Sequence, residues 1–316
     1  MQPSSSSSAR ITRDFRQSRW DEHLADHVAA AARGWFAEEL GHECDWTSVA
    51  LVGAGAVAEL NVVARKPGVI AGLEAAAVVA RVADEQLVWR PLAADGELVE
   101  AGTAVATLGG PTRSVLTAER VLLNLIGRMS GVATATRMLV DKVAGTRCRV
   151  YDTRKTVPGW RLLDKYAVRL GGGWNHRMGL YDAILIKDNH IAAMAADAIG
   201  AAEAVRLARK FVAESFPASR AGQMVVEVEV DSLEQLEAVL PAGPDVVLLD
   251  NMPPDRLVRG VSLRDRIAPG VVLEASGGVR PETIRGIAES GVDRVSTGWP
   301  THGAPWLDVA LDWAAR

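Results

Sequence analysis

The stretch "DVVLLDNMPPDRLVRGVSLRDRIAPGVVLEASGG", residues 245–278, decides the fold. It opens with a short apolar run closed by Asp250, continues with helical spacing over 254–266, and ends in a second apolar run before Gly277 and Gly278. Short β-branched runs that alternate with helical patterns are typical of strands joined by helices. The stretch therefore predicts a strand, a helix and a second strand parallel to the first.

The same alternation fills the chain from Cys148 onward. Six runs predict strands: "CRVYD", "AILIKD", "MVVEVEV", "DVVLLD", "VVLEAS" and "DRVST". Helical patterns follow them at 159–170, 194–213, 232–240, 254–266, 281–290 and 305–315. Repeated strand–helix units with right-handed crossovers build an α/β barrel, and six clear strands rather than eight indicate an incomplete TIM-like barrel.

The first part of the chain is organised differently. Residues 21–40 predict a helix that ends at Gly41, residues 49–110 predict a small, mostly β unit, and residues 114–145 predict a long helix in which Gly127 and Gly131 permit a break or a close packing contact. We expect a disordered Ser-rich tail over 1–15, an N-terminal domain over 16–130 onto which a C-terminal helix can pack, and a barrel domain over 131–316.

Composition narrows the class of protein. A formal net charge of −4 argues against a general nucleic-acid binder. Cys44 and Cys148 lack metal-ligand spacing and are interpreted as reduced thiols. The start "MQPSSSSSAR" has no apolar signal region, and the apolar runs end well short of a membrane span, so a soluble cytoplasmic protein is expected.

Polar groups follow every predicted barrel strand, where barrel enzymes build their active sites. They are Asp152–Lys155, Lys187–His190, Glu227 with Glu229 and Asp231, Asp250 with Asn251, Glu274 with Ser276 to Gly278, and Ser296 to Gly298 with His302 soon after. Six such ends in register predict one functional mouth rather than scattered surface polarity.

Cations converge on this mouth. "RLGGGWNHRMGLYD", residues 169–182, places His176 and Arg177 directly after a flexible triple glycine. The converging cations are Arg154, Lys155, Arg177 and Lys187. Clustered buried cations are costly unless anions pair them, and the planar fork of arginine suits carboxylate or phosphate. The sequence therefore predicts an anionic ligand.

Two further features of the sequence concern the binding of phosphate and of a metal ion. "SGGVRPETI" predicts a glycine-rich turn that enters a helix at Pro281, a pattern that favours phosphate binding. Glu229 and Asp250 either hold Mg²⁺ together with substrate oxygens or form salt bridges to the lysines.

Together these motifs resemble the quinolinate phosphoribosyltransferase family, also called nicotinate-nucleotide pyrophosphorylase (carboxylating). The resembling segments are "TAERVLLNLIGRMSGVATAT", "DTRKTVPGWRLLDKYAVRLGGGWNHRMGLYDAILIKDNHI", "VEVEVDSLEQLEAVL", "VVLLDNM", "LEASGGV" and "GVDRVSTGWPTH". The resemblance implies transfer of phosphoribose from phosphoribosyl pyrophosphate to quinolinate with decarboxylation, giving nicotinate mononucleotide, pyrophosphate and CO₂ in NAD biosynthesis. It also implies a requirement for Mg²⁺, an N-terminal α/β sandwich domain before the incomplete barrel, and a homodimer.

The resemblance also implies roles for single residues. Thr153, Arg154, Lys155, His176, Arg177 and Lys187 would surround quinolinate and the pyrophosphate, with Lys155 and Lys187 among the catalytic groups. Glu229 and Asp250 would face the ribose and the metal as catalytic carboxylates, while Ser276, Gly277, Gly298 and His302 would hold the 5-phosphate. Arg120, which by itself predicts only a solvated helix face, would enter the active site of the neighbouring subunit. Trp299, Pro300 and Gly303 depart from the usual family sequence.

Other functions remain possible on residue chemistry. Lys187 at a strand end also suits a Schiff-base lyase on the same barrel. A non-catalytic binder of phosphorylated metabolites is favoured by the altered last motif alone. A closer rival is a family relative that acts on another pyridine acid or serves a metal-uptake pathway.

Overall fold

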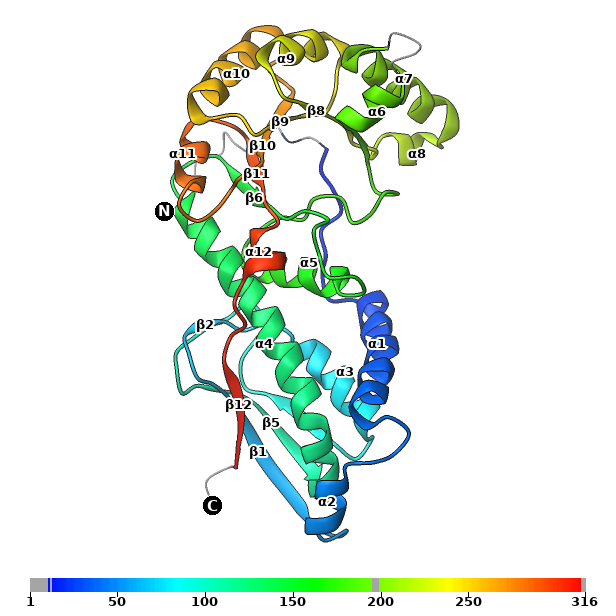
Figure 1. Ribbon diagram of the computed structural model, residues 1–316, viewed down its shortest axis with the longest axis vertical. Coiled ribbons are helices and arrows are strands. Elements are labelled where there is room, and N and C mark those ends of the chain that lie inside the picture. The colour runs from blue at the N-terminus through cyan, green and yellow to red at the C-terminus, as the bar shows by residue number, and fades with distance from the viewer. Residues whose placement is uncertain (1–10, 12, 195–198, 314–316) are drawn as a thin grey trace. The chain divides into compact units, whose positions relative to one another are not determined.

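The computed structural model describes Ile11, Arg13–Met194 and Ile199–Trp313, which form two compact units (Figure 1). Of the described residues, the barrel unit comprises those up to Gln17 and those within Met138–Lys155 and Gly173–Trp299. The sandwich unit comprises Ser18–Arg137, Thr156–Gly172 and the described residues from Pro300 to Trp313.

The barrel unit is built on one parallel sheet. Its strands are β6 (Arg149–Tyr151), β7 (Ile184–Ile186), β8 (Val226–Val230), β9 (Val246–Asp250), β10 (Val272–Ser276) and β11 (Arg294–Ser296). They pair in parallel in the order β6-β11-β10-β9-β8-β7. Among the residues that the structure describes, the edge strands β6 and β7 do not pair with each other, which confirms the expectation of an incomplete barrel.

The two faces of this sheet differ because side chains alternate along a strand. The outer face carries residues such as Val228, Leu249 and Leu273, which form one apolar core with the surrounding helices. These helices are α6 (Asp188–Ala193), α7 (Ala201–Ser215), α8 (Ala218–Ala221), α9 (Leu233–Val239), α10 (Pro254–Ile267) and α11 (Ile284–Glu289), several of which cover the sheet in Figure 1. The alternate positions Glu227 and Glu274 therefore face the inner side.

Phe15 covers the amino end of the sheet's inner face. It is buried against Tyr151, Val246 and Val272, of which the last two begin β9 and β10. Asp14 accepts a 2.6 Å hydrogen bond from the hydroxyl of Tyr151. The predicted disordered tail over 1–15 is therefore wrong for Asp14 and Phe15, because an aromatic ring there closes an otherwise exposed apolar edge. Residues 1–10 and 12 lie outside the described part of the chain.

The sandwich unit contains a four-stranded antiparallel sheet flanked by helices. The strands β1 (Val57–Ala64), β3 (Val88–Pro91), β5 (Ala104–Pro111) and β12 (Val309–Trp313) pair in the order β12-β1-β5-β3, and β2 (Gly68–Val69) pairs with β4 (Leu98–Val99). The helices are α1 (Glu22–Leu40), α2 (Trp46–Leu51), α3 (Leu73–Ala83), α5 (Arg161–Leu170) and most of α4 (Thr112–Lys142), with α12 (Trp299–Gly303) at the unit boundary. Apolar residues of α1, α3, α4 and the sheet share one core.

The end of the chain forms a strand where a helix was predicted. Over 305–315 the expected helix is absent from the described residues, and β12 pairs antiparallel with β1, with Leu60 opposite Trp313. The reason is tertiary: β1 offers an unpaired edge whose backbone groups β12 satisfies, and a partner about 250 residues away leaves no local signal.

The expected domain boundary at 130/131 also differs from the compact units. Helix α4 runs through that position without interruption, and the segments 156–172 and 300–313 group with the sandwich unit. The predicted close packing along α4 is confirmed. A Cβ atom on Gly127 would lie 2.9 Å from the carbonyl oxygen of Leu307, and one on Gly131 would meet the carbonyl of Pro305.

No helix within the described residues is both long and apolar enough to cross a bilayer. Cys44 is exposed, Cys148 is buried, and both are free thiols, as predicted.

Candidate active site

The carboxyl ends of the parallel strands bring several predicted site residues together. Lys187 directly follows β7, and its Nζ lies 2.7 Å from Oε2 of Glu229 on the neighbouring β8. On the other side, Asp250 of β9 pairs in register with Ser276 of β10, whose hydroxyl lies 3.1 Å from that of Ser296. The predicted salt bridge between Glu229 and a lysine is therefore present.

Asp152 fixes the loop that carries His176 and Arg177. Its two carboxylate oxygens accept hydrogen bonds of 2.8 Å from the backbone N–H of His176 and the side-chain amide of Asn175. Trp174 forms a parallel bridge with Tyr151, so this segment extends the sheet beside β6. The loop after the glycines is consequently held in one conformation at the strand end.

Arg154 and Arg177 place two like charges together with few compensating groups. Arg177 is 6% exposed, and its Nη1 donates to the carbonyl of Ala183 at 3.3 Å. Burial lowers the pKa of the Arg177 guanidinium, and the positive charge of Arg154 lowers it further. The buried Nε of Arg154 has no hydrogen-bond acceptor among the residues described. Such a pair calls for an external anion that accepts from both guanidinium groups.

Lys155 and Thr153 lie beside this pair at the end of β6. Lys155 is exposed, and its backbone N–H donates to Oγ1 of Thr153 at 3.0 Å. The threonine hydroxyl thereby shapes the turn that presents Arg154 and Lys155.

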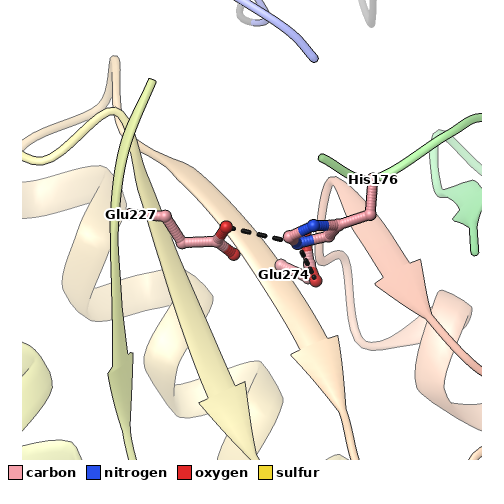
Figure 2. Close-up of side chains that lie close together, drawn as sticks. All are labelled: His176, Glu227 and Glu274. Carbon is pink, nitrogen blue, oxygen red and sulfur yellow. Dashed lines mark ion pairs between the residues drawn. The ribbon is translucent and has the colours of Figure 1, made fainter. Parts of the chain in front are cut away.

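The ring of His176 points toward the sheet interior rather than into solvent. Its Nε2 lies 3.2 Å from Oε2 of Glu227 and 3.4 Å from Oε1 of Glu274, and all three side chains are buried (Figure 2). Phe15 stacks on the ring with 4.3 Å between centroids. Arg294 completes the group, with its Nε 2.6 Å from Oε2 of Glu274.

These side chains could also be taken for a metal site, because the ligand atoms of His176, Glu227 and Glu274 lie within 4.8 Å of one another. The guanidinium of Arg294 already supplies one positive charge to Glu274, and a protonated His176 supplies the second. A charge-balanced cluster of side chains therefore explains the arrangement without a metal ion.

The protonation of His176 depends on opposing effects of its surroundings. The backbone N–H of Arg177 lies 2.9 Å from Nδ1, which favours a neutral ring. Burial also lowers the pKa of His176, but the charges of Glu227 and Glu274 outweigh it and raise the pKa to about 9. The two carboxylates therefore favour the imidazolium form.

The glycine-rich turn after β10 has the predicted backbone freedom. Gly277 and Gly278 adopt φ values of 93° and 60°, and a Cβ atom on Gly277 would collide with the side chain of Asn251. The predicted helix start at Pro281 is wrong: residues 281–283 form turns, and α11 begins at Ile284. Gly298 is buried after β11. No observation here tests phosphate binding, which stays a prediction.

Two predicted site residues belong to the other unit. Arg120 lies on α4 and His302 on α12, both within the sandwich unit and both exposed. The structure describes them within that unit alone, so their roles stay predictions.

Sequence reasoning did not identify Arg294 or Phe15 as neighbours of the site. The alternation of β10 and β11 could have indicated that Glu274 and Arg294 share the inner face, where they sit directly opposite each other. Phe15 gives no local signal, because its partners begin strands far along the chain.

Comparisons with known proteins agree with this geometry. Residues 45–130 match the family described as quinolinate phosphoribosyl transferase, N-terminal domain, and residues 132–312 match its C-terminal domain. The chain belongs to the quinolinate phosphoribosyl transferase family. The nicotinate-nucleotide pyrophosphorylase [carboxylating] of Mycobacterium leprae is 44% identical over 279 residues, which span 87% of this chain and 93% of that protein.

Other members of the family extend the agreement to structure. A probable nicotinate-nucleotide pyrophosphorylase [carboxylating] of Bacillus subtilis is 39% identical over 88% of this chain and 90% of that protein. The solved structure of the nicotinate-nucleotide pyrophosphorylase from Francisella tularensis is 36% identical and superposes with a TM-score of 0.85, covering 95% of this chain and all of that one.

Proposed function

We propose that this chain is a quinolinate phosphoribosyltransferase that transfers phosphoribose from phosphoribosyl pyrophosphate to quinolinate and releases CO₂ and pyrophosphate, a step of NAD biosynthesis. Family membership supports the reaction. The observation that carries it at the level of the site is the juxtaposition of Arg154 and Arg177, in which the buried Nε of Arg154 has no acceptor among the described residues. A pyridine with two carboxylates supplies acceptors of the right charge and geometry.

The binding step follows from this charge distribution. Arg154, Lys155 and Arg177 attract the two carboxylates of quinolinate, and the rigid loop tied to Asp152 orients the ring nitrogen. The ring nitrogen attacks C1 of the ribose while the bond from C1 to the pyrophosphate oxygen breaks. The electron pair of the broken bond leaves with pyrophosphate. The protein gains most by positioning two anions that would otherwise repel each other.

The second half of the reaction breaks the bond between C2 of the pyridine and its carboxylate. CO₂ leaves, the electron pair stays on C2 next to the cationic ring nitrogen, and C2 then takes up a proton. Lys187, held by Glu229, contributes positive charge near the departing pyrophosphate, while Asp250 favours the cationic ribose.

The carboxylates at the strand ends fit a magnesium ion in part. Glu229 uses one oxygen for Lys187, and Asp250 accepts 2.9 Å from the side-chain amide of its neighbour Asn251, so each retains a second oxygen. Asp250, which lacks a cationic partner among the ion pairs described, is the better direct ligand. When bound with the substrate, Mg²⁺ would neutralise charge on the pyrophosphate.

We further propose a cytoplasmic homodimer in which Arg120 reaches the partner's site and His302 binds the 5-phosphate together with Ser276, Gly277 and Gly298. The exposure of Arg120 on α4 supports the first role, since an unburied cation is available to a second subunit.

The decisive experiment for acceptor choice compares quinolinate with nicotinate, each with phosphoribosyl pyrophosphate and Mg²⁺. The expected result is product formation with quinolinate alone, because nicotinate lacks the second carboxylate. Equal use of nicotinate, or tight binding of both substrates without pyrophosphate release, would contradict the proposal.

The Schiff-base alternative is disfavoured by the ion pair of Lys187. A nucleophilic amine must be free to attack a carbonyl, whereas the Nζ of Lys187 is already engaged by Glu229 at 2.7 Å. Borohydride trapping with carbonyl compounds should leave Lys187 unmodified.

A further inference from the structure

Glu227 is a buried carboxylate with unusually little compensation. It is 0% exposed, and neither of its oxygens accepts a well-formed hydrogen bond from any residue that the structure describes. Glu274 has the guanidinium of Arg294 at 2.6 Å, whereas Glu227 pairs with His176 at 3.2 Å. A buried carboxylate of this kind is costly, so its charge must serve nearby cations.

Glu227 acts on His176 and Arg177, two cationic residues of the loop over 169–182. Its Oε2 faces Nε2 of His176, and its charge raises the pKa of the adjacent Arg177, against the lowering by burial and by Arg154. Glu227 therefore acts on consecutive residues of the loop whose cations, under the proposed function, receive quinolinate.

We propose that Glu227 is a positioning residue for the acceptor: it holds the ring of His176 as an imidazolium against the inner face of the sheet and so fixes the loop on which Arg177 receives the carboxylates of quinolinate. This proposal rests on the proposed function for its catalytic consequence. The charged groups around the ring are Glu227 from β8, Glu274 from β10, Arg294 from β11 and Arg177 from the same loop, and Phe15 covers the ring with an apolar face.

The direction in which Glu227 shifts the pKa of His176 follows from the groups around the ring. With both carboxylates present, the pKa of His176 is raised to about 9 even though burial lowers it. Removing the charge of Glu227 leaves burial in place and only Glu274 to oppose it, so the pKa falls. The wild-type ring stays charged through neutral pH, whereas the variant ring becomes neutral as the pH rises.

The test uses Glu227→Gln, which keeps the shape and removes the charge. Proton NMR follows the titration of His176, identified by the signal that disappears in His176→Asn. The expected result is a titration midpoint lowered by more than about one unit. Steady-state kinetics should show a quinolinate KM raised about tenfold at about pH 8 and much less at about pH 6, with the phosphoribosyl pyrophosphate KM within about twofold. Glu203→Gln, which removes an exposed carboxylate 2.7 Å from Arg206, is the matched control and should change neither quantity.

A double variant separates action through the ring from a general loss of packing. If Glu227 works through His176, adding Glu227→Gln to His176→Asn raises the quinolinate KM no further. Glu227→Asp, which keeps the charge, should retain a raised midpoint and supplies the comparison if the glutamine variant does not fold.

Three results would overturn the proposal: an unmoved His176 titration in Glu227→Gln, an equal rise in KM at both pH values, or additive effects in the double variant. Failure of the wild type to use quinolinate would instead overturn the proposed function, while the NMR titration would still decide what Glu227 does to the ring.

Discussion

Lys187 and Glu229 form a 2.7 Å ion pair across the carboxyl ends of the neighbouring strands β7 and β8. The pair leaves Lys187 partly exposed, at an edge where the sheet also presents Asp250 and Ser276. One carboxylate thus holds a lysine in place at the strand ends, while the buried Nε of Arg154 has no acceptor among the described residues.

Lys155→Ala should abolish most turnover without unfolding the protein. The side chain is exposed, so its loss leaves no cavity, and removal of one preorganised charge lowers kcat/KM by about 10²–10³-fold. Steady-state kinetics and thermal melting of the same sample provide the measurement. Arg206→Ala, at an exposed surface pair, is the control, and near-normal turnover of Lys155→Ala would remove Lys155 from the proposed chemistry.

Arg120→Ala and Lys155→Ala should each be inactive alone and regain activity when mixed, if Arg120 serves the partner subunit. In a mixed dimer one site combines an intact Lys155 with an intact Arg120, so random exchange restores about a quarter of the sites. The activity of unfolded and co-refolded mixtures measures this. No recovery, with dimers present by light scattering, would show that Arg120 does not act across subunits.

Glu274→Gln should destabilise the fold, because it leaves Arg294 buried beside a neutral partner. Breaking such a pair costs about 3–5 kcal/mol of unfolding free energy. Replacing Arg294 by Met in the same chain should recover part of the loss. Denaturant unfolding of the single and the double variant measures both effects. If Glu274→Gln were as stable as the wild type, Glu274 and Arg294 would not form a stabilising buried ion pair.

The same pair predicts a dependence of stability on acid. Burial raises the pKa of Glu274, but His176 and Arg294 outweigh it and lower the pKa from 4.5 to about 2. A lowered pKa contributes stability above about pH 4.5 that is lost as the pH falls toward about 2. Acid titration of the unfolding free energy should therefore be steeper in the wild type than in Glu274→Gln, and identical slopes would rule the contribution out.

Gly277→Ala should weaken binding of phosphoribosyl pyrophosphate more than Gly278→Ala does. Both residues have positive φ, but a Cβ atom on Gly277 meets the side chain of Asn251, whereas one on Gly278 meets nothing within 4 Å. The KM of each variant for phosphoribosyl pyrophosphate gives the comparison. Equal effects would mean that backbone conformation alone, and not the contact with Asn251, shapes the turn.

Much of the barrel unit could be predicted from the sequence because its signals are local. Each strand is a short apolar run followed by a helical pattern, and the period of two already places Glu227 and Glu229 on one face. Since parallel strands share one carboxyl edge, the convergence of Lys187, Glu229 and Asp250 followed from the fold class alone.

The features that were missed depend on contacts between distant parts of the chain. β12 forms a strand because β1 offers it an edge, and Phe15 is ordered because the first residues of β9 and β10 need cover. The inward direction of the His176 ring depends on Glu227 and Glu274 from two separate strands. No local pattern around Phe15, His176 or Val309 carries this information.

The most direct test of the account is a single-turnover reaction with quinolinate labelled in its 2-carboxyl group. Enzyme, phosphoribosyl pyrophosphate and Mg²⁺ should release labelled CO₂ and pyrophosphate in equal amounts, and Arg177→Lys should suppress both together because it loses the fork that holds a carboxylate. Pyrophosphate release without CO₂, or an unimpaired Arg177→Lys, would contradict a site built to bring a doubly charged pyridine to the phosphoribosyl donor.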